Sequence, residues 1–534
     1  MRLSARAAIA AMCAMFAMTL TLGCGARTAP RVWDAAPPVP DCITDEDCDD
    51  HLYCTGRESC REGRCVPGAP VVCIDGDECT GDDCSEATRT CVHAALSRDA
   101  DGDGYRAPRD GYRPGAPGAC GDDCDDTNRN VHPGATEICN GIDDDCNGVI
   151  DDRATFTPTN IDVRVSEPST APSGPGGLAW AGERYLSSYW GYTEGTSHVY
   201  FSALDRNGMR ISTPPQIRIT LTPSDAFGAA VAWNGTELGI VWQDRRDGDY
   251  EIYFNRLTPY GERLAPDQRV TFARGFSINP SITWTGTEYI LAWQDERDTL
   301  GSGGYEIYAQ RVARDGRQVE DNARITRDPS NSEAPIIVSN ARNGLGLVWL
   351  DGRGGPMNEP TSSRGIWFAV LSNELQRMSP DLRITRPGES VVAPALTWNR
   401  DRWVLAWHDA ADASPDHEIW GATRDAGGLE IAAPLRLTND RGFSRYPTLI
   451  PLGDRLMLIW ADDRTGPGYE IYARMMTPEL TPLTAETRVT MAPRDSVYPV
   501  ATLGPEGDIG VLYRDQREGR WQVNFTRLQC AIPR

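Results

Sequence analysis

Residues 280–298 read PSITWTGTEYILAWQDERD, and residues 305–326 continue as YEIYAQRVARDGRQVEDNARIT. The same pattern occupies residues 229–271, AAVAWNGTELGIVWQDRRDGDYEIYFNRLTPYGERLAPDQRVT. Each copy holds four short runs rich in β-branched and aromatic residues, with alternating apolar positions and Gly/Asp turns between them. We denote these runs a (AxxW), b (LxxW), c (EIYxxR) and d (xRIT). A self-similar unit of four short strands predicts a β-class repeat architecture.

The unit recurs from residue 160 to the end of the chain. The aromatic residue of run b recurs at Tyr189, Trp242, Trp293, Trp349, Trp407, Trp460 and Tyr513. Six of these aromatics are followed two residues later by an aspartate, at Asp244, Asp295, Asp351, Asp409, Asp462 and Asp515. Run c carries Ile252, Ile307, Ile366, Ile419 and Ile471, and run d carries Arg218, Arg269, Arg324, Arg383, Arg436 and Arg488. Repeats of about 51 to 59 residues fit the four-stranded blades of a β-propeller and exceed the usual solenoid repeats. The predicted fold class is mainly β, with a seven-bladed propeller over residues 160–530.

The two ends of the repeat region indicate how the ring closes. The last copy ends with WQVNFTRL (521–528) and has no run d, whereas IDVRVSE (161–167) stands unpaired before the first run a. We expect residues 161–167 to complete the last blade, with Val163 and Val165 pairing near Val523. Such closure removes exposed strand edges.

The N-terminus, MRLSARAAIAAMCAMFAMTLTLGCG, has Arg2 and Arg6 before an apolar run that is too short for a stable membrane span. Its end resembles the lipobox of bacterial lipoproteins, although Thr21 stands where that pattern usually has Leu. The resemblance implies a signal peptide over 1–24, lipidation at Cys24 and an outer-membrane or cell-surface location. Secretion after cleavage near Ala26 is the alternative. Residues 25–40, rich in Pro and Ala, are expected to be a linker.

The cysteines indicate a disulfide framework. Of 16 cysteines, Cys13 lies in the signal and Cys24 is the lipidation candidate, which leaves an even number in an exported chain. The disulfide candidates are Cys42, Cys48, Cys54, Cys60, Cys65, Cys73, Cys79, Cys84, Cys91, Cys120, Cys124, Cys139, Cys146 and Cys530. Residues 41–98 hold nine of them and no hydrophobic period, so they are expected to form a disulfide-rich module. One partner must come from beyond residue 98, and the connectivity stays open. Metal thiolate binding is the alternative, but no CxxC pair is present.

Two acidic stretches follow, in a module expected over residues 99–153. RDADGDGYRAPRD (98–110) places Asp99, Asp101, Asp103, Tyr105 and Asp110 at positions 1, 3, 5, 7 and 12 of a calcium-loop template, with Gly104 at position 6. GIDDDCNGVIDD (141–152) places Asp143, Asp145, Asn147, Val149 and Asp151 at positions 1, 3, 5, 7 and 9, with Gly148 at position 6. Position 12 is Ala154, so a closing carboxylate would have to come from Asp152 or a neighbour such as Asp122. The sequence predicts two cation loops; a solvated acidic spacer is the alternative.

Residues 99–152 resemble the MopE-type metal-binding motif found in exported proteins of myxobacteria and their relatives. The preceding CIDGDECTGDDCSEATRTCVHA (73–94) resembles the Cys-rich units that often accompany it. The family label implies copper, which prefers thioether, thiolate or imidazole ligands, yet residues 99–152 offer His132 and neither Met nor Trp. Carboxylate oxygens favour calcium, and Mg²⁺ less so because it resists dehydration. Calcium is therefore the expected cofactor, with copper as the alternative.

Composition excludes several function classes. The 534-residue chain has a net charge of −23 and a pI of about 4.7, which argues against nucleic acid as a partner. Residues 41–98 contribute −9 and residues 99–152 contribute −10 of that charge. All 53 basic residues are arginine, which excludes a P-loop lysine and a Schiff-base lysine.

The sequence predicts an exported, lipid-anchored surface protein that binds divalent metal and is expected to be a monomer. The propeller is expected to be a ligand-binding or adhesion platform rather than an enzyme, because HExxH, GxSxG and the sialidase Asp box SxDxGxTW are absent. A propeller glycosidase or lyase is the alternative, and a copper-binding surface protein is a second one. The repeated aspartates and arginines are interpreted as structural. The longer loops 299–304, 352–364 and 410–417 are the expected place for a glycan or protein ligand.

Overall fold

The computed structural model describes residues 41–532 except 152–153, 160, 169, 300–303, 354–363, 387–388, 390, 410–416 and 467. The chain forms two compact units, Met1–Leu96 and Ser97–Arg534. The predicted signal peptide with Cys24 and the linker 25–40 lie outside the described residues. Within the part that the structure describes, no helix has the length and apolar character needed to cross a membrane.

The described part of the first unit consists of short elements joined by disulfides. They are the 3-10 helix η1 (Asp45–Cys48) and the strands β1 (Ser59–Arg61), β2 (Arg64–Val66), β3 (Thr80–Ser85) and β4 (Thr90–Ala95). β1 pairs with β2 and β3 with β4, both antiparallel. Four disulfides join Cys42 to Cys60, Cys48 to Cys65, Cys54 to Cys84 and Cys73 to Cys91. Cys42 and Cys73 are the buried apolar residues here, so covalent bonds replace a hydrophobic core, as expected from the sequence.

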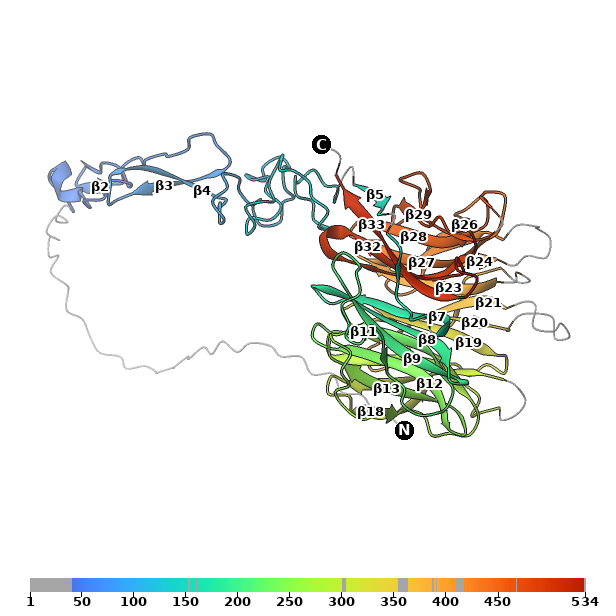
Figure 1. Cartoon of the computed structure of the whole chain (residues 1–534). Coiled ribbons are helices and arrows are strands. Elements are labelled where there is room, and N and C mark those ends of the chain that lie inside the picture. The colour runs from blue at the N-terminus through green and yellow to red at the C-terminus, as the bar shows by residue number, and fades with distance from the viewer. Residues whose placement is uncertain are drawn as a thin grey trace, which may run out of the picture. The chain divides into compact units, whose positions relative to one another are not determined.

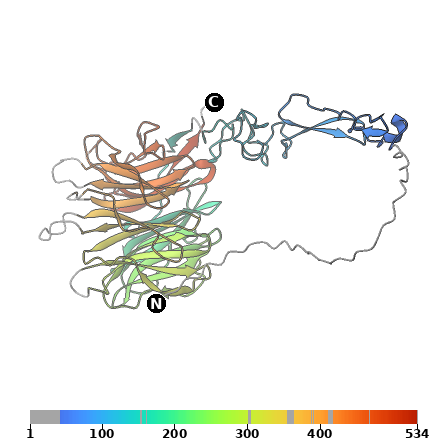
Figure 2. The ribbon, with the colours of Figure 1, turned by 180° about the vertical axis from the view of Figure 1, so that it is seen from behind.

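The propeller predicted from the repeat is confirmed, with its sheets following one another from β7 to β33 in Figures 1 and 2. The inner strands, from run a, are β7 (Ala171–Trp180), β11 (Ala226–Trp233), β15 (Ser277–Trp284), β19 (Ser332–Ser339), β23 (Val391–Asn399), β27 (Ser444–Leu452) and β31 (Ser496–Leu503). Run b forms β8 (Arg184–Thr193), β12 (Leu238–Asp247), β16 (Glu288–Asp295), β20 (Leu345–Asp351), β24 (Arg402–Asp409), β28 (Arg455–Asp462) and β32 (Ile509–Asp515).

The outer half of each blade comes from runs c and d. Run c forms β9 (Thr196–Asp205), β13 (Asp249–Leu257), β17 (Glu306–Ala313), β21 (Gly365–Leu371), β25 (Ile419–Asp425), β29 (Glu470–Met476) and β33 (Gln522–Ala531). Run d forms β10 (Ile217–Arg218), β14 (Gln268–Arg269), β18 (Gln318–Arg324), β22 (Leu382–Arg383), β26 (Glu430–Arg436) and β30 (Thr487–Arg488). Each inner strand contacts the next, and β31 contacts β7, so the seven inner strands form a closed ring.

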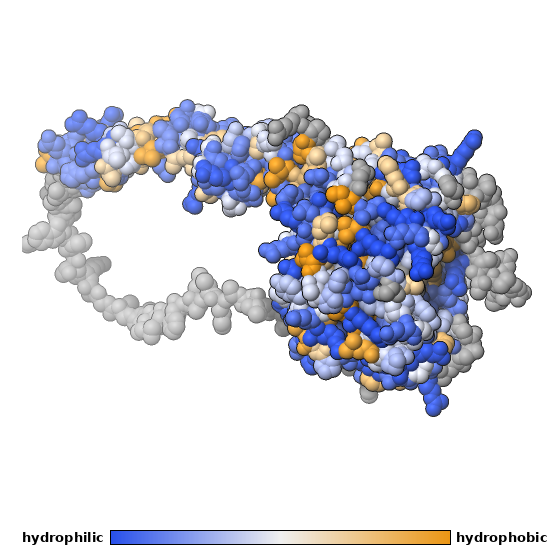
Figure 3. Space-filling model, viewed as in Figure 1, coloured by the Kyte–Doolittle hydropathy of each residue, from blue (hydrophilic) through white to orange (hydrophobic). Residues whose placement is uncertain are grey.

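The hydrophobic core consists of seven interfaces between consecutive blades. One cluster joins Trp242 and Ile240 of the second blade to Phe201 of the first, and another joins Tyr185 of the first blade to Phe525 of the last. The b strands lie between two neighbouring blades and are buried on both faces. This explains why YILAW (289–293) reads as a continuous apolar run rather than an alternating one. On the face drawn in Figure 3, hydrophobic residues form small groups among hydrophilic ones.

The predicted ring closure is confirmed. β6 (Val163–Arg164) pairs with β33, with Phe525 opposite Val163, and the N–H of Val165 donates to the carbonyl of Val523 at 2.8 Å. Arg164 donates from Nε to the carbonyl of Ser166, as Arg324 does to Thr326 in a regular run d. The segment therefore replaces the missing d strand in its hydrogen bonds as well as in its position.

One strand of this blade was not anticipated. β5 (Thr155–Pro158) precedes the predicted start of the propeller and pairs with the C-terminal half of β33, from Pro158 opposite Leu528 to Thr155 opposite Ala531. The last blade thus has two N-terminal strands on β33, and β5 lies beside β33 in Figure 1. Its four residues are too few to give a periodic pattern.

The acidic module belongs to the same compact unit as the propeller. Its described residues from Ser97 to Ile150 form turns and bends without helix or strand. Cys139 is disulfide-bonded to Cys530 at the end of β33, and Arg455 donates from Nη1 to the carbonyl of Asp151 at 3.1 Å. A Cβ at Gly507 would lie 2.7 Å from the carbonyl oxygen of Cys139, so this contact requires glycine. The module is therefore fastened to the propeller both covalently and by close packing.

Candidate functional site

The first acidic loop is held by hydrogen bonds from its own backbone. The carboxylate of Asp99 accepts from the N–H of Gly102 at 2.7 Å and of Gly104 at 3.1 Å. Asp101 accepts from the N–H of Asp103, and Asp103 accepts from the N–H of Tyr105. Gly104 has a φ of 101°, the left-handed conformation that glycine adopts readily. These bonds turn three carboxylates inward, and their oxygens lie within 4.8 Å of one another.

The second loop repeats this geometry except at one hydrogen bond, since its first acid accepts from position 5 where that of the first loop accepts from position 4. Asp143 accepts from the N–H of Asn147 and of Gly148, at 3.1 and 2.8 Å. Asp145 accepts from the N–H of Asn147, and the side chain of Asn147 accepts from the N–H of Val149. Gly148 has a φ of 92°. Two segments with the same spacing of acids and glycine therefore fold into a similar turn. A solvated acidic spacer would not be expected to repeat such a turn.

Each loop is joined by an acid that the sequence reasoning did not select. Asp123 is 1% exposed, and the neighbouring charges of Asp103 and Asp101 act on its carboxyl group. Glu137 is 7% exposed, and its carboxylate forms one group with those of Asp143 and Asp145, within 4.8 Å. Glu137 precedes its loop, so a template read forward from Asp143 could not find it. The glutamate supplies the extra carboxylate that was expected from Asp152 or Asp122.

Four buried carboxylate oxygens in these two groups have no hydrogen-bond partner within the described structure. They are one oxygen each of Asp101, Asp103, Asp123 and Glu137. A buried carboxylate oxygen without a donor is costly, and native proteins place such atoms where an ion or an ordered molecule satisfies them. The unpaired oxygens therefore mark both groups as candidate cation sites.

The electrostatics agree with this interpretation. Burial raises the pKa of the Asp123 carboxyl, and the charges of Asp103 and Asp101 raise it further. Burial likewise raises the pKa of Glu137, and the charges of Asp144, Asp145 and Asp143 add to the shift. Like charges this close repel one another, and a bound cation would remove that repulsion.

Other predicted ligands lie elsewhere in the described structure. Asp110 is exposed and belongs to neither carboxylate group. The carboxylate of Asp151 accepts instead from the N–H of Asn140 and of Gly141, and so holds the turn before the second loop. Asp152 lies outside the described residues. His132 stacks on Tyr105 with ring centroids 4.7 Å apart, and its Nδ1 lies 3.2 Å from the carbonyl oxygen of Pro133.

The cysteines that the structure describes offer no thiolate to a metal. All fourteen disulfide candidates from Cys42 to Cys530 are disulfide-bonded, including Cys79 and Cys120. Cys124 is bonded to Cys146, which links the stretch after Asp123 to the second loop. The pairing of Cys139 with Cys530 joins residues separated by 391 positions, so no local spacing could have revealed it.

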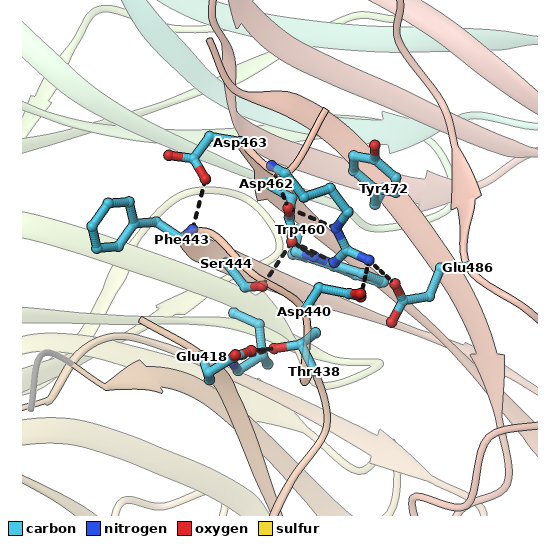
Figure 4. Close-up of polar contacts among 12 residues, drawn as sticks. Glu418, Thr438, Asp440, Phe443, Ser444, Trp460, Asp462, Asp463, Tyr472 and Glu486 are labelled. Carbon is cyan, nitrogen blue, oxygen red and sulfur yellow. Dashed lines mark hydrogen bonds and ion pairs between the residues drawn. The ribbon is translucent and has the colours of Figure 1, made fainter. Parts of the chain in front are cut away.

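The repeated aspartates of the propeller have structural partners. In the sixth blade, Asp462 accepts from Trp460 Nε1 at 3.0 Å and from Ser444 Oγ at 2.7 Å (Figure 4). Arg464 also donates to this carboxylate. Burial opposes ionisation of Asp462, but these hydrogen bonds outweigh it and lower the pKa. Asp295 has the equivalent partners in the third blade, Trp293, Ser277 and Arg297. The WxDxR motif therefore ties the b strand to the inner strand and the turn.

The repeated arginine of run d is equally structural. Arg324 donates to Glu306 at 2.7 Å, and the hydroxyl of Thr326 donates to the same carboxylate. The same pairing connects Arg436 and Thr438 to Glu418 in the fifth blade; Figure 4 draws the contact between Glu418 and Thr438. Most residues of the three longer loops, 300–303, 354–363 and 410–416, lie outside the described residues, so the predicted ligand sector stays a prediction.

Several solved structures are similar to this chain. They include the polysaccharide lyase Uly1, at 9% identity and a TM-score of 0.43, covering 66% of this chain and 89% of the lyase. An α-L-arabinanase from Penicillium chrysogenum has 12% identity and a TM-score of 0.37, covering 55% of this chain and 89% of the arabinanase. An α-L-arabinofuranosidase from Fusarium graminearum has 14% identity and a TM-score of 0.40, covering 60% of this chain and 98% of that enzyme.

These similarities correct one expectation from the sequence. The chain was expected not to be an enzyme because familiar catalytic motifs are absent, yet the similar structures include a lyase and glycosidases. A missing motif is therefore no reason to exclude catalysis. At identities this low the similarity concerns the fold alone and assigns no activity.

No curated protein matches the sequence. Residues 123–152 match the family model described as "Putative metal-binding motif". The match begins at Asp123 and includes Glu137 and the whole second loop. The resemblance to the MopE-type motif is thereby confirmed over these residues, and this chain carries a metal-binding motif of that family next to a seven-bladed β-propeller.

Proposed function

We propose that this chain is an exported surface protein in which calcium stabilises the acidic module and the propeller presents a ligand-binding surface. The observation that carries the calcium assignment is the set of unpaired buried oxygens on Asp101, Asp103, Asp123 and Glu137. Asp101 and Asp103 belong to one carboxylate group and Glu137 to the other, while the charges of Asp103 and Asp101 act on Asp123. The module that holds them is covalently tied to the propeller.

The donor set favours calcium over copper. Calcium binds six to eight oxygen ligands from carboxylates and carbonyls, and both loops offer such oxygens. Copper prefers sulfur or imidazole donors. The cysteines of the module are disulfide-bonded, and its one histidine, His132, is stacked against Tyr105. Copper binding stays the alternative because the family label of the motif implies copper.

Export and surface attachment are part of the proposal. Fourteen disulfide-bonded cysteines support an oxidising compartment outside the cytoplasm. The signal-like N-terminus and Cys24 support a lipid anchor in the outer membrane, with secretion as the alternative. Calcium is plentiful outside cells, so a module with almost no hydrophobic core can rely on it for stability.

Calorimetric titration of Ca²⁺ into the chelator-treated mature chain tests the proposal. The whole chain is required because Cys139 of the module is bonded to Cys530 of the propeller. We expect two binding events, with D123N weakening one and E137Q weakening the other by at least about tenfold, because each removes a charge from one group. D83N, a change at an exposed aspartate of the first unit, is the matched control and should bind as the wild type does. Absence of Ca²⁺ binding, or copper in the purified protein, would refute the calcium assignment.

A further inference from the structure

A pocket of about 690 Å³ lies where the inner strands of four consecutive blades begin. These strands are β23, β27, β31 and β7, of the fifth, sixth, seventh and first blades. Its polar and aromatic lining residues include Trp190, Tyr446, Tyr498 and Arg514. The pocket is thus on the inner ring of the propeller and is separate from the acidic module.

The residues around this pocket break the repeat. The aspartate of run b recurs in six blades, but the residue immediately before it differs from blade to blade. With the equivalent residue of the first blade placed first, these residues are Trp190, Gln243, Gln294, Leu350, His408, Ala461 and Arg514. In the second and third blades this residue is a glutamine that accepts the N–H of Asn279 or Ala334 on the next inner strand. In the fifth blade His408 accepts the N–H of Tyr446 in the same way, whereas Trp190 and Arg514, which line the pocket, stand at the equivalent positions of the first and seventh blades. Such asymmetry is what a ligand site needs and what the repeated aspartates lack.

Two tyrosines pack against each other, and the pair forms an aromatic wall of the pocket. The rings of Tyr446 and Tyr498 have centroids 4.1 Å apart, and their hydroxyl oxygens lie 3.2 Å from each other. His408 packs edge-on against Tyr446, with centroids 5.3 Å apart, and supports the wall from behind. Tyr498 is 40% exposed, so part of this wall is open to a ligand. The exposed side of this pair, with two hydroxyl groups close to each other, suits a ligand with apolar faces and a hydroxyl-rich edge.

Arg514 is a cation with no anionic partner among the described residues. Its guanidinium lies 4.0 Å from the ring centroid of Trp521, and its Nε is buried without a hydrogen-bond acceptor. By contrast, Arg517, three residues later, holds Asp515 through both Nε and Nη2. A guanidinium held against an aromatic ring and lacking a carboxylate presents a bidentate site for one.

Prolines on the inner strands argue against a peptide as the ligand. Pro175, Pro394, Pro447 and Pro499 line the pocket. They cannot donate a backbone hydrogen bond, so an extended peptide could not add to these strand edges in a regular ladder. A saccharide needs no such ladder, since it binds through ring faces and hydroxyl groups.

We propose that this pocket binds a carboxylate-bearing saccharide, with its sugar ring on the wall of Tyr446 and Tyr498 and its carboxylate on Arg514. The inference deepens the proposed ligand-binding role of the propeller and rests on it. It is independent of the calcium assignment, since none of the lining residues belongs to the acidic module.

The test compares acidic oligosaccharides with their carboxyl-reduced counterparts. Oligomers of galacturonate, glucuronate, mannuronate and guluronate are titrated calorimetrically into the full mature chain, saturated with Ca²⁺. The wild type is expected to bind at least one of them at least about tenfold more tightly than its carboxyl-reduced form. R514Q should lose this discrimination, and Y498A should weaken binding of both forms. R342Q, at an exposed arginine in the turn between β19 and β20, should bind as the wild type does.

The outcomes of this test distinguish a failure of the saccharide inference from a failure of the calcium assignment. The inference is overturned if the wild type binds none of these oligosaccharides, binds both forms equally, or keeps its discrimination in R514Q. Ca²⁺ titration of the same R514Q sample should give the wild-type result, and D123N should keep saccharide binding. A failure of the saccharide arm with intact Ca²⁺ binding therefore refutes this inference and leaves the calcium assignment standing. The opposite pattern refutes calcium alone.

Discussion

The backbone N–H of Val165 donates to the carbonyl oxygen of Val523 at 2.8 Å, and this bond joins the N-terminal end of the propeller to its last blade. The side chain of Val165 is fully buried between the first and last blades, in contact with a cluster that includes Tyr189 and Phe525. The ring is therefore closed by hydrogen bonds and by a hydrophobic interface at the same residue.

A charge at Val165 should open the ring. V165D places an unpaired carboxylate in this interface and is expected to lower the free energy of unfolding by about 3–5 kcal/mol. Ile161, four residues earlier, is 51% exposed, so I161D should change the free energy by less than about 0.5 kcal/mol. Urea unfolding followed by tryptophan fluorescence measures both. Equal stability of the two variants would contradict the closure described here.

Loss of a repeated aspartate should destabilise the propeller. D462A leaves Trp460 Nε1, Ser444 Oγ and the guanidinium of Arg464 short of an acceptor, so we expect a loss of about 3–5 kcal/mol. The control is D401N, because the Asp401 side chain is 72% exposed. Its effect should stay below about 1 kcal/mol. A D462A protein as stable as the wild type would mean that these contacts are not structural.

Removal of the Cys139–Cys530 disulfide should release the acidic module. The bond closes a segment with a sequence separation of 391, so in the chain-entropy model the double variant C139S/C530S loses about 6 kcal/mol. The variant C124S/C146S, with a separation of 22, should lose about 3 kcal/mol. Differential scanning calorimetry gives the two values. If the long-range bond contributes less than the short one, the module is held by noncovalent contacts instead.

The buried His408 should make the protein sensitive to acid. Burial, together with the charges of Arg445 and His417, lowers the pKa of His408 to about 3, whereas the unfolded chain takes up the proton near the ordinary value of 6.5. The unfolded state therefore binds more protons between these values. The contribution of His408 is fully present above pH 6.5 and is lost progressively, by up to about 1.4 kcal/mol per pH unit, as the pH falls toward 3.

The variant H408Q isolates this effect. Its free energy of unfolding should fall less steeply than that of the wild type between pH 6.5 and 4.5, when both are measured by urea unfolding. H51Q is the control, since the His51 side chain is 85% exposed, and it should follow the wild type. Parallel curves for wild type and H408Q would show that His408 is not buried in the neutral form.

Much of the fold follows from local patterns that depend on neighbours in sequence. The runs around Trp293 and Trp242 are continuously apolar where both faces of a strand are covered, and they alternate where one face is covered. The number of blades and the order of the strands can therefore be predicted. The two acidic loops can be predicted for the same reason. Their turn is built from hydrogen bonds between residues at most five apart, such as Asp99 to Gly104 and Asp143 to Gly148.

Contacts between distant segments could not be predicted. Asp123 and Glu137 are single acids among many in the sequence, and both are buried only in the folded chain. Glu137 then lies beside Asp143 and Asp145, and Asp123 feels the charges of Asp103 and Asp101. Asp110 fits the loop template by spacing but is exposed. The spacing of residues in the sequence predicts which of them meet within one turn. It does not predict which acid from another turn will be buried beside them.

The amino-acid sequence by itself determined the seven four-stranded blades, the closing strand 161–167 and the turn geometry of both acidic loops. All three arise from periodicity or from hydrogen bonds within a few residues. Only the tertiary structure decided the disulfide between Cys139 and Cys530, the addition of Glu137 to the second loop, and the place of Arg514 with no carboxylate partner in the described part of the chain. These features depend on which distant groups share a buried volume, and burial and charge pairing exist only once the ring of blades has closed.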